Sequence, residues 1–355
     1  MTHKFNYKWT LKDAKFTKDK GKVFSCFACG GGSTMGYKLA GFDVLGCNEI
    51  DSKMMEAYRV NHNPKYSYLE PIQTFKNRTD LPDELYNLDI LDGSPPCSSF
   101  SMAGNREKDW GKEKKFREGQ SSQVLDTLFF DFIDLAKELK PKVVIAENVK
   151  GLLLGAAKDY VRRIYESFDK AGYFCQHFLL NAAKMGVPQR RERIFFICIR
   201  KDLAIKFLHQ QDLFSFKPLI KMKFNEKEIA FKEFDSGKYG LKVYPSVLEW
   251  FEKTKPGESV CNCIRRYGLK EKLFSYRKVN PDHPLKTILS AYDSGEFRHD
   301  APYYLHDDDI ILGGSFPTDY NFLNLKVKYL VGMSVPPIMT ANIASEVYNQ
   351  WLSKL

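Results

Sequence analysis

The stretch that decides the fold is Val23-Phe-Ser-Cys-Phe-Ala-Cys-Gly-Gly-Gly-Ser33. A short apolar run stops at three glycines, and residues 33–40 then carry the spacing of a helix, with Ser33 or Thr34 as the candidate N-cap. The stretch therefore predicts a strand, a glycine turn and a helix in succession.

The same alternation continues along the chain as far as residue 199. Further strands are predicted at 42–47, 88–91, 143–146, 174–180 and 194–199, and further helices at 54–60, 124–139 and 160–171. Strands that alternate with helices predict an α/β protein with a doubly wound, Rossmann-like, mostly parallel sheet. In such a sheet the functional site is expected at the carboxyl ends of the strands.

The rhythm changes after Arg200, where segments rich in lysine, phenylalanine and tyrosine replace the alternation until a final predicted helix at 340–355. We therefore expect two domains in the 355 residues, one formed by 1–203 with 326–355 and a smaller one formed by 204–325.

Positive charge is concentrated in the predicted second domain. The whole chain has a net charge of +10, and residues 200–286 hold 19 basic and 11 acidic side chains. This excess is typical of a module that binds a polyanion, although a solvated basic surface is an alternative reading.

The chain carries no signal for export or for a membrane. It lacks a run of eighteen apolar residues, and its first 22 residues are mixed and rich in lysine. Its eight cysteines are scattered through apolar stretches, which favours reduced thiols. Cys26-x-x-Cys29 has a redox spacing, but with Cys261-x-Cys263 it does not complete a zinc site, so no metal is expected. We expect a cytoplasmic protein without a membrane partner.

The glycine turn and Glu49 suggest an adenosine cofactor. Glu49 follows the second predicted strand 19 residues after Gly30, close to the offset at which an acid reaches a nucleotide ribose. The turn is neither a G-x-G-x-x-G fingerprint nor a Walker loop, which disfavours NAD and ATP. S-adenosylmethionine, which has a ribose and no phosphate, is the natural candidate.

Three further motifs supply reactive groups. They are Pro96-Cys97, Glu147-Asn148-Val149 and Gln189-x-Arg191-x-Arg193. A thiol nucleophile, a carboxyl proton donor and guanidinium groups are the parts needed to activate an electron-poor base.

In this order the motifs resemble those of the DNA (cytosine-5)-methyltransferases of bacterial and phage type, and the match runs from about Val23 to Val347. Phe27 to Gly32 matches the first motif of that family, Pro284 to Ile288 its ninth, and Gly332 to Pro337 leads into its last helix. Three features depart from the family pattern: Ser25 stands where the family has Asp, Pro71 interrupts the third motif, and Met333 replaces Asn. The resemblance implies an S-adenosylmethionine-binding catalytic domain with a smaller, basic target-recognition domain.

The resemblance also implies roles for individual residues. Cys97 would add to C6 of cytosine, Glu147 would protonate N3, and Arg191 and Arg193 would hold the base and its backbone. The residues expected at the cofactor are Phe27, Ala28, Gly30, Gly31, Gly32, Glu49, Ile50, Ile72, Pro96, Leu128, Asn148 and Ser334.

The expected partner is duplex DNA, from which the target base must be flipped out. The residues expected to contact DNA are Ser101, Arg106, Lys108, Gln189, Arg265, Arg266, Tyr267, Arg277 and Lys278. We expect a monomer that recognises a short site, compatible with a cognate restriction endonuclease that acts separately.

Two other functions fit the same motifs. An RNA cytosine-5 methyltransferase would use the same Pro-Cys and Glu-Asn-Val residues, although the large basic domain favours DNA. A catalytically silent DNA-binding protein is the second alternative; Met333 favours it, whereas intact Cys97 and Glu147 argue against it.

Overall fold

The computed structural model describes residues 3–96, 113–114, 123–124, 127–154, 157–210, 216–270, 273, 276–291 and 295–355. The chain forms two compact units. The sheet unit comprises Lys15–Leu180, Glu192–Lys223 and Ala341–Leu355, and the second unit comprises Met1–Ala14, Asn181–Arg191 and Phe224–Thr340. The domain limits predicted from the sequence stay a prediction.

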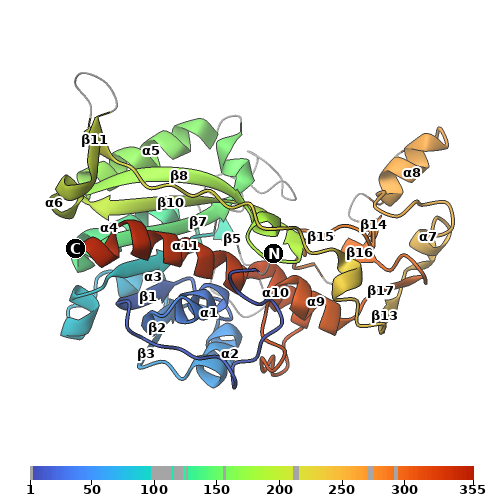
Figure 1. Cartoon of the computed structure of the whole chain (residues 1–355), viewed down its shortest axis with the longest axis horizontal. Helices are drawn as coiled ribbons and strands as arrows, with labels where there is room; N and C mark the ends of the chain where they lie inside the picture. The colour runs from blue at the N-terminus through green and yellow to red at the C-terminus, as the bar shows by residue number, and fades with distance from the viewer. Residues whose placement is uncertain are drawn as a thin grey trace. The chain divides into compact units, whose positions relative to one another are not determined.

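A seven-stranded sheet in the order β3-β2-β1-β4-β7-β10-β8 forms the centre of the sheet unit (Figure 1). Its strands are β1 Lys22–Cys26, β2 Asp43–Glu49, β3 Tyr66–Leu69, β4 Ile90–Gly93, β7 Val143–Val149, β8 Tyr173–Asn181 and β10 Glu192–Arg200. The predicted strands are all present, and the mostly parallel α/β sheet is confirmed.

The direction of the strands decides which residues meet at one edge. The four pairings that join β3, β2, β1, β4 and β7 are parallel, whereas β10 runs antiparallel to β7. The amino end of β10 therefore lies at the carboxyl end of β7, and Arg193 pairs with Val149. This reversal brings the start of β10 to the edge at which the predicted site residues lie.

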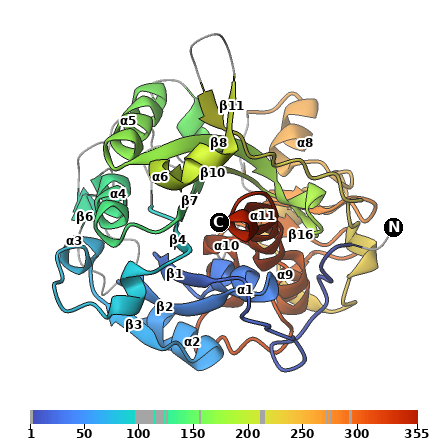
Figure 2. The same ribbon diagram turned by 60° about the vertical axis from the view of Figure 1, so that its left-hand side comes forward.

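Helices cover both faces of this sheet. Apolar side chains of β1, β4, β7 and β10 pack on one face against α3 Ile72–Phe75, α4 Leu128–Leu139 and α5 Ala157–Lys170, which lie together in Figure 2. The alternate side chains Ser25 and Asp92 point to the opposite face, toward α1 Gly32–Leu39. Burial of both faces explains why these strands read as apolar runs.

The helices begin within four residues of the starts predicted from the sequence, and two of the differences have a local cause. Helix α4 begins at Leu128, because Val124 instead pairs in the short strands β5 Glu113–Lys114 and β6 Gln123–Val124. The N-cap of α1 is Gly31, whose φ is 83°, and the Ser33 hydroxyl donates to Asp92 instead of capping. Helix α2 Ser52–His62 is capped by Asp51, which accepts the N–H groups of Lys53 and Met54.

The second unit contains a four-stranded sheet in the order β13-β17-β16-β14. The elements of this part are β13 Tyr239–Lys242, α7 Pro245–Leu248, α8 Val260–Arg266, β14 Tyr276–Lys278, β16 Gly295–Phe297, β17 Tyr303–Leu305, α9 Asp307–Gly313 and α10 Val327–Met333. Its core joins Val247 of α7, Cys263 and Ile264 of α8 and Phe297 of β16. Separately, β9 Gln189–Arg190 pairs in parallel with β15 Leu285–Lys286. Helix α11, Pro337–Gln350, confirms the final predicted helix.

Among the described residues, no helix is long and apolar enough to cross a membrane.

Candidate active site

The glycine turn after β1 has an unusual backbone. Phe27, Cys29 and Gly31 all have positive φ, at 53°, 49° and 83°. A Cβ placed on Gly31 would lie 2.1 Å from Nε2 of His62, so only glycine fits there. Burial lowers the pKa of His62 to about 3, so its neutral ring lies against the Gly30 carbonyl, 3.2 Å away. The turn at the carboxyl end of β1 is thus buried and packed closely against His62.

Glu49 ends the neighbouring strand β2 and is tied to the same turn. One carboxylate oxygen accepts the Cys29 N–H at 2.8 Å, and the other accepts the N–H groups of Ile50 and Asp51. Burial raises the pKa of Glu49, and these backbone hydrogen bonds oppose the rise. The oxygen that binds Cys29 can accept a further hydrogen bond, as a ribose hydroxyl requires.

Asp92 is a site residue that the sequence analysis missed. It lies beside Ser25 in the β1–β4 register and is 4% exposed. Its carboxylate accepts hydrogen bonds from the hydroxyls of Ser25 (2.6 Å), Ser33 (2.8 Å) and Tyr37 (3.0 Å). The sequence signal for Asp92 is Ser25, which stands where the family pattern has Asp. The acid that β1 lacks is found at the paired position of β4.

Glu147 and Arg193 meet where β7 and β10 run antiparallel. Arg193 Nε lies 2.9 Å from Glu147 Oε1, with side chains 15% and 13% exposed. Arg193 is opposite Val149, so its side chain is on the same face as Glu147, two residues along β7. The structure thus joins two of the four predicted catalytic residues in one ion pair.

Asn148, the residue after Glu147 on β7, holds the segment that precedes the predicted nucleophile. Its Nδ2 donates to the Pro95 carbonyl at 3.1 Å, and its Oδ1 accepts the Val149 N–H. Asn148 therefore positions the Pro95-Pro96 segment at the end of β4.

Arg191 and Gln189 both contact the protein itself, whereas the sequence analysis predicted that they contact the base and the DNA. Arg191, 3% exposed, donates to the carbonyls of Ile288 (3.2 Å) and Gly332 (2.9 Å). Gln189 is buried, donates to the Gly313 carbonyl and accepts the Ile288 N–H. Both side chains fasten segments of the second unit, because buried backbone carbonyls and amides need partners.

Several predicted cofactor residues lie in the core. Ile72 and Leu128 belong to the core beneath α3 and α4, which leaves them no open surface toward a ligand. Ile50 is half-buried beside Glu49. Ser334 lies in the second unit, where its hydroxyl donates to the Leu330 carbonyl.

The predicted DNA contacts of the second unit have different surroundings. Arg265 and Tyr267 are exposed, and Arg266 pairs with Glu258 at 3.1 Å. Arg277 donates to the Gly257 carbonyl and is half-buried. Lys278 is buried, because its ammonium donates to the Phe251 carbonyl and lies 3.9 Å from the centre of the Phe251 ring; this position does not suit a DNA contact.

Four predicted residues, namely Cys97, Ser101, Arg106 and Lys108, lie outside the described residues.

Comparison with known proteins identifies the family of this chain. The model of the C-5 cytosine-specific DNA methylase family matches residues 21–349. The Type II methyltransferase M.NgoFVII of Neisseria gonorrhoeae is 27% identical over 95% of this chain and 89% of its own. M.FnuDI of Fusobacterium nucleatum is 36% identical over 52% of this chain, an alignment that spans about half, 48%, of that relative.

Solved structures show the same fold. A putative DNA modification methyltransferase encoded within an Escherichia coli prophage superposes with a TM-score of 0.63 at 20% identity, over 92% of this chain and 98% of that one. Spodoptera frugiperda DNMT2 also gives 0.63, at 16% identity and over 92% and 99% of the two chains. Because the family model spans nearly the whole chain, this protein belongs to the C-5 cytosine-specific DNA methylase family.

Proposed function

We propose that this chain transfers a methyl group from S-adenosylmethionine to C5 of a cytosine flipped out of duplex DNA. The observation that carries the proposal is the Glu147–Arg193 ion pair at the carboxyl end of β7. Its neighbour Asn148 holds the Pro95 carbonyl, two residues before Cys97. The segment that leads to the nucleophile and the acid thus both lie at the carboxyl ends of the neighbouring strands β4 and β7.

The chemistry follows from these side chains. The Cys97 thiolate adds to C6 of the cytosine while Glu147 gives a proton to N3, which makes C5 nucleophilic. S-adenosylmethionine, held beside Glu49, would supply an electrophilic methyl group for C5 and would leave as the neutral thioether. A base that takes the proton from C5 then lets the C5–C6 double bond form again and expels Cys97 as the thiolate, while N3 returns its proton to Glu147.

Arg193 is the guanidinium that we assign to the base. Its Nε holds Glu147 and its Nη1 donates to the Glu192 carbonyl, so we assign its Nη2 to the O2 atom of cytosine. Arg191 supports the segments that carry Ile288 and Gly332, and we assign it a positioning role.

The sheet unit offers a fitting place for the methyl donor. Glu49 accepts the Cys29 N–H of the turn after β1 and keeps an acceptor position for a ribose hydroxyl. Pro96 follows the segment that Asn148 holds, so it would border the same place.

DNA would bind through exposed or half-buried cations of the second unit, among them Arg265, Arg266 and Arg277 with Tyr267. Ser101, Arg106 and Lys108 stay proposed contacts. The residues of one chain suffice for the chemistry, so we propose a monomer; a restriction endonuclease would be a separate protein.

The decisive experiment is methyl transfer from labelled S-adenosylmethionine to mixed-sequence duplex DNA and, separately, to a tRNA pool, followed by nucleoside analysis. Label in 5-methylcytosine from DNA, lost in Cys97→Ser, is the expected result. Label in RNA alone would show that the protein is an RNA cytosine-5 methyltransferase instead. Methyl transfer by Cys97→Ser at the wild-type rate would overturn the mechanism.

A further inference from the structure

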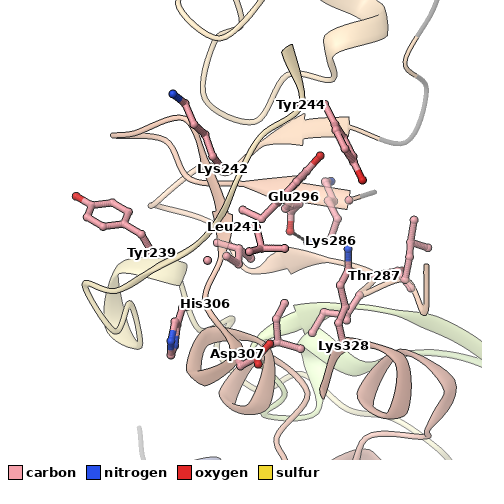
Figure 3. Close-up of a pocket in the computed structure, with 17 residues that line it drawn as sticks. Tyr239, Leu241, Lys242, Tyr244, Lys286, Thr287, Glu296, His306, Asp307 and Lys328 are labelled. Carbon is pink, nitrogen blue, oxygen red and sulfur yellow. Dashed lines mark hydrogen bonds between the residues drawn. The ribbon is translucent and has the colours of Figure 1, made fainter. Parts of the chain in front are cut away.

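A pocket of the second unit is lined by none of the residues assigned above to the chemistry. It has a volume of about 390 Å³ and is lined by β13, β16, β17, the start of α9 and residues 286–289. Tyr239 and Tyr244 contribute aromatic rings, and Lys242, Lys286 and Lys328 contribute cations. Figure 3 shows Glu296 and Lys286 between Tyr244 on one side and Asp307 and Lys328 on the other.

Cations gather around one carboxylate at this place. Lys286 and Glu296 also line a second, adjoining hollow, which contains Arg190 and Arg277. Arg277 is directly opposite Glu296 in the β14–β16 pairing. Burial, together with Arg277 and Arg190, lowers the pKa of Lys286, which shows how closely these cations are placed. The two hollows together are lined by five cations and two carboxylates, and one of the cations, Arg190, is paired with Glu228 at 2.7 Å. The remaining excess of positive charge suits a polyanion.

Glu296 has unused capacity to accept hydrogen bonds. Its Oε2 accepts the Lys286 backbone N–H at 2.7 Å, and within the described part of the chain this is the one hydrogen bond to the carboxylate. Burial raises the pKa of Glu296 to about 7, although the Lys286 N–H and the charges of Arg277 and Lys286 oppose the rise. An N–H donor that enters the pocket would stabilise the charged form.

We infer that this pocket reads a base pair of the DNA: Glu296 accepts a hydrogen bond from an exocyclic amino group, N4 of cytosine or N6 of adenine, while Lys242, Lys286 and Lys328 hold the flanking phosphates. A carboxylate can accept from these amino groups, whereas guanine O6 and N7 and thymine O4 are acceptors that it repels. Lysine gives phosphate contacts that position the duplex without selecting sequence. The inference rests on the proposed function and adds a specificity-determining residue to it.

Glu296→Gln tests the readout, because the amide keeps the shape and loses the charge. Wild type and variant would methylate a pool of duplexes whose bases around a fixed cytosine are randomised, and bisulfite sequencing would give the preferred site of each. We expect the wild type to prefer C or A at one position. The preference of the variant should shift by about tenfold or more from C toward A at that position alone, because a glutamine amide pairs with both N6 and N7 of adenine. Glu249→Gln, an exposed change in the same unit outside the pocket, is the matched control.

The outcomes separate this inference from the proposed function. If the wild type methylates no DNA, the proposed function fails. If it methylates DNA and Glu296→Gln keeps the same preference at every position, the assignment of Glu296 is overturned. Equal thermal unfolding and equal S-adenosylmethionine binding of the two proteins would show that a changed preference is not a folding defect.

Lys328→Gln tests the phosphate contacts. We expect weaker binding to all duplexes, an unchanged preferred site and a slope of log affinity against log salt that is smaller by about one. Lys227→Gln, an exposed change in the same unit that does not line the pocket, should leave the slope unaltered. A slope equal to that of the wild type in Lys328→Gln would contradict its role at phosphate.

Discussion

At the scale of single residues, the site depends on two carboxylates with different surroundings. Glu147 shares a partly exposed ion pair with Arg193, whereas Asp92 is buried and surrounded by three hydroxyl donors. We propose that the first exchanges a proton with a ligand, whereas the second holds the neighbouring elements β1, β4 and α1 together. These positions lead to different expectations for substitution.

Glu147→Gln should remove the proposed proton donor while the hydrogen bond to Arg193 is kept. We expect methyl transfer to fall by about 10²–10⁴-fold, the usual contribution of general acid catalysis, with little change in binding of S-adenosylmethionine. Single-turnover kinetics with labelled methyl donor would measure this. Glu166→Gln, an exposed change on α5, should react at the wild-type rate, and an equal rate in Glu147→Gln would exclude the acid role.

Asp92 should make stability depend on pH. Burial raises its pKa to about 6 from 3.8, although its three hydroxyl partners oppose the rise. The folded state therefore holds more protons than the unfolded state between these values, and the free energy of unfolding should decline as pH rises from about 4 to 6. The full decline is roughly 3 kcal/mol and persists above pH 6.

Urea unfolding of the wild type and Asp92→Asn at several pH values would measure this contribution. The stability of the variant relative to the wild type should increase between pH 4 and 6, because the amide does not ionise. Curves that stay parallel over this range would show that Asp92 is not the titrating group. Asp159→Asn, whose carboxylate is 83% exposed, is the control.

Asp92 should also matter for the methyl donor, because it binds both Ser25 of β1 and Ser33 of α1, which flank the glycine turn. We expect Asp92→Ser to weaken S-adenosylmethionine binding by about tenfold, since hydrogen bonds to a charged group contribute about 1.5–3 kcal/mol each. The double variant Ser25→Asp/Asp92→Ser moves the acid from β4 to the paired position of β1. It should recover most of the affinity for S-adenosylmethionine. Calorimetric titration would decide; a double variant as weak as the single one would exclude a shared role.

At the scale of elements, the turn between β1 and α1 is the most constrained part of the sheet unit. Gly31 has a positive φ, and the His62 ring occupies the space that a side chain at position 31 would need. Gly172, between α5 and β8, has a similar φ of 91° with open space around it. A comparison of substitutions at Gly31 and Gly172 therefore distinguishes the cost of backbone strain from the cost of the steric contact with His62.

Gly31→Ala should destabilise the sheet unit more than Gly172→Ala does. The positive φ costs alanine about 1 kcal/mol at either position. At Gly31 the contact with His62 adds to this, and the turn that would receive the methyl donor shifts. Thermal unfolding and S-adenosylmethionine binding of both variants would measure the difference. Equal losses of stability in the two variants would show that the His62 side chain moves aside without cost.

At the scale of the whole molecule, charge and chemistry are carried by different segments. The net charge is +10, and most of the excess lies in residues 200–286, whereas Glu49, Asp92 and Glu147 belong to the first 150 residues. Binding of DNA and binding of the methyl donor should therefore respond differently to salt.

We expect the affinity for duplex DNA to fall linearly in log affinity against log salt between 50 and 200 mM, by a factor of about 10³ if six phosphates are contacted. Binding of S-adenosylmethionine should change by less than about threefold over the same range, because it depends on hydrogen bonds in a buried turn. Equilibrium titrations in one buffer series would test both. A shallow slope for DNA would argue against phosphate contacts as the main source of affinity.

The sequence by itself determined the alternation of strands and helices, the turn after β1, and the presence of an acid at the ends of β2 and β7. These features depend on apolar periodicity and turn residues within short windows, which are local properties of the chain. The tertiary structure decided which distant residues meet. The antiparallel course of β10 gives Arg193 to Glu147, whereas Arg191, two residues earlier, is held by the Ile288 and Gly332 carbonyls. Likewise Asp92 finds Ser25 only through the β1–β4 register, because the pairing of strands far apart in sequence is set by packing of the whole sheet.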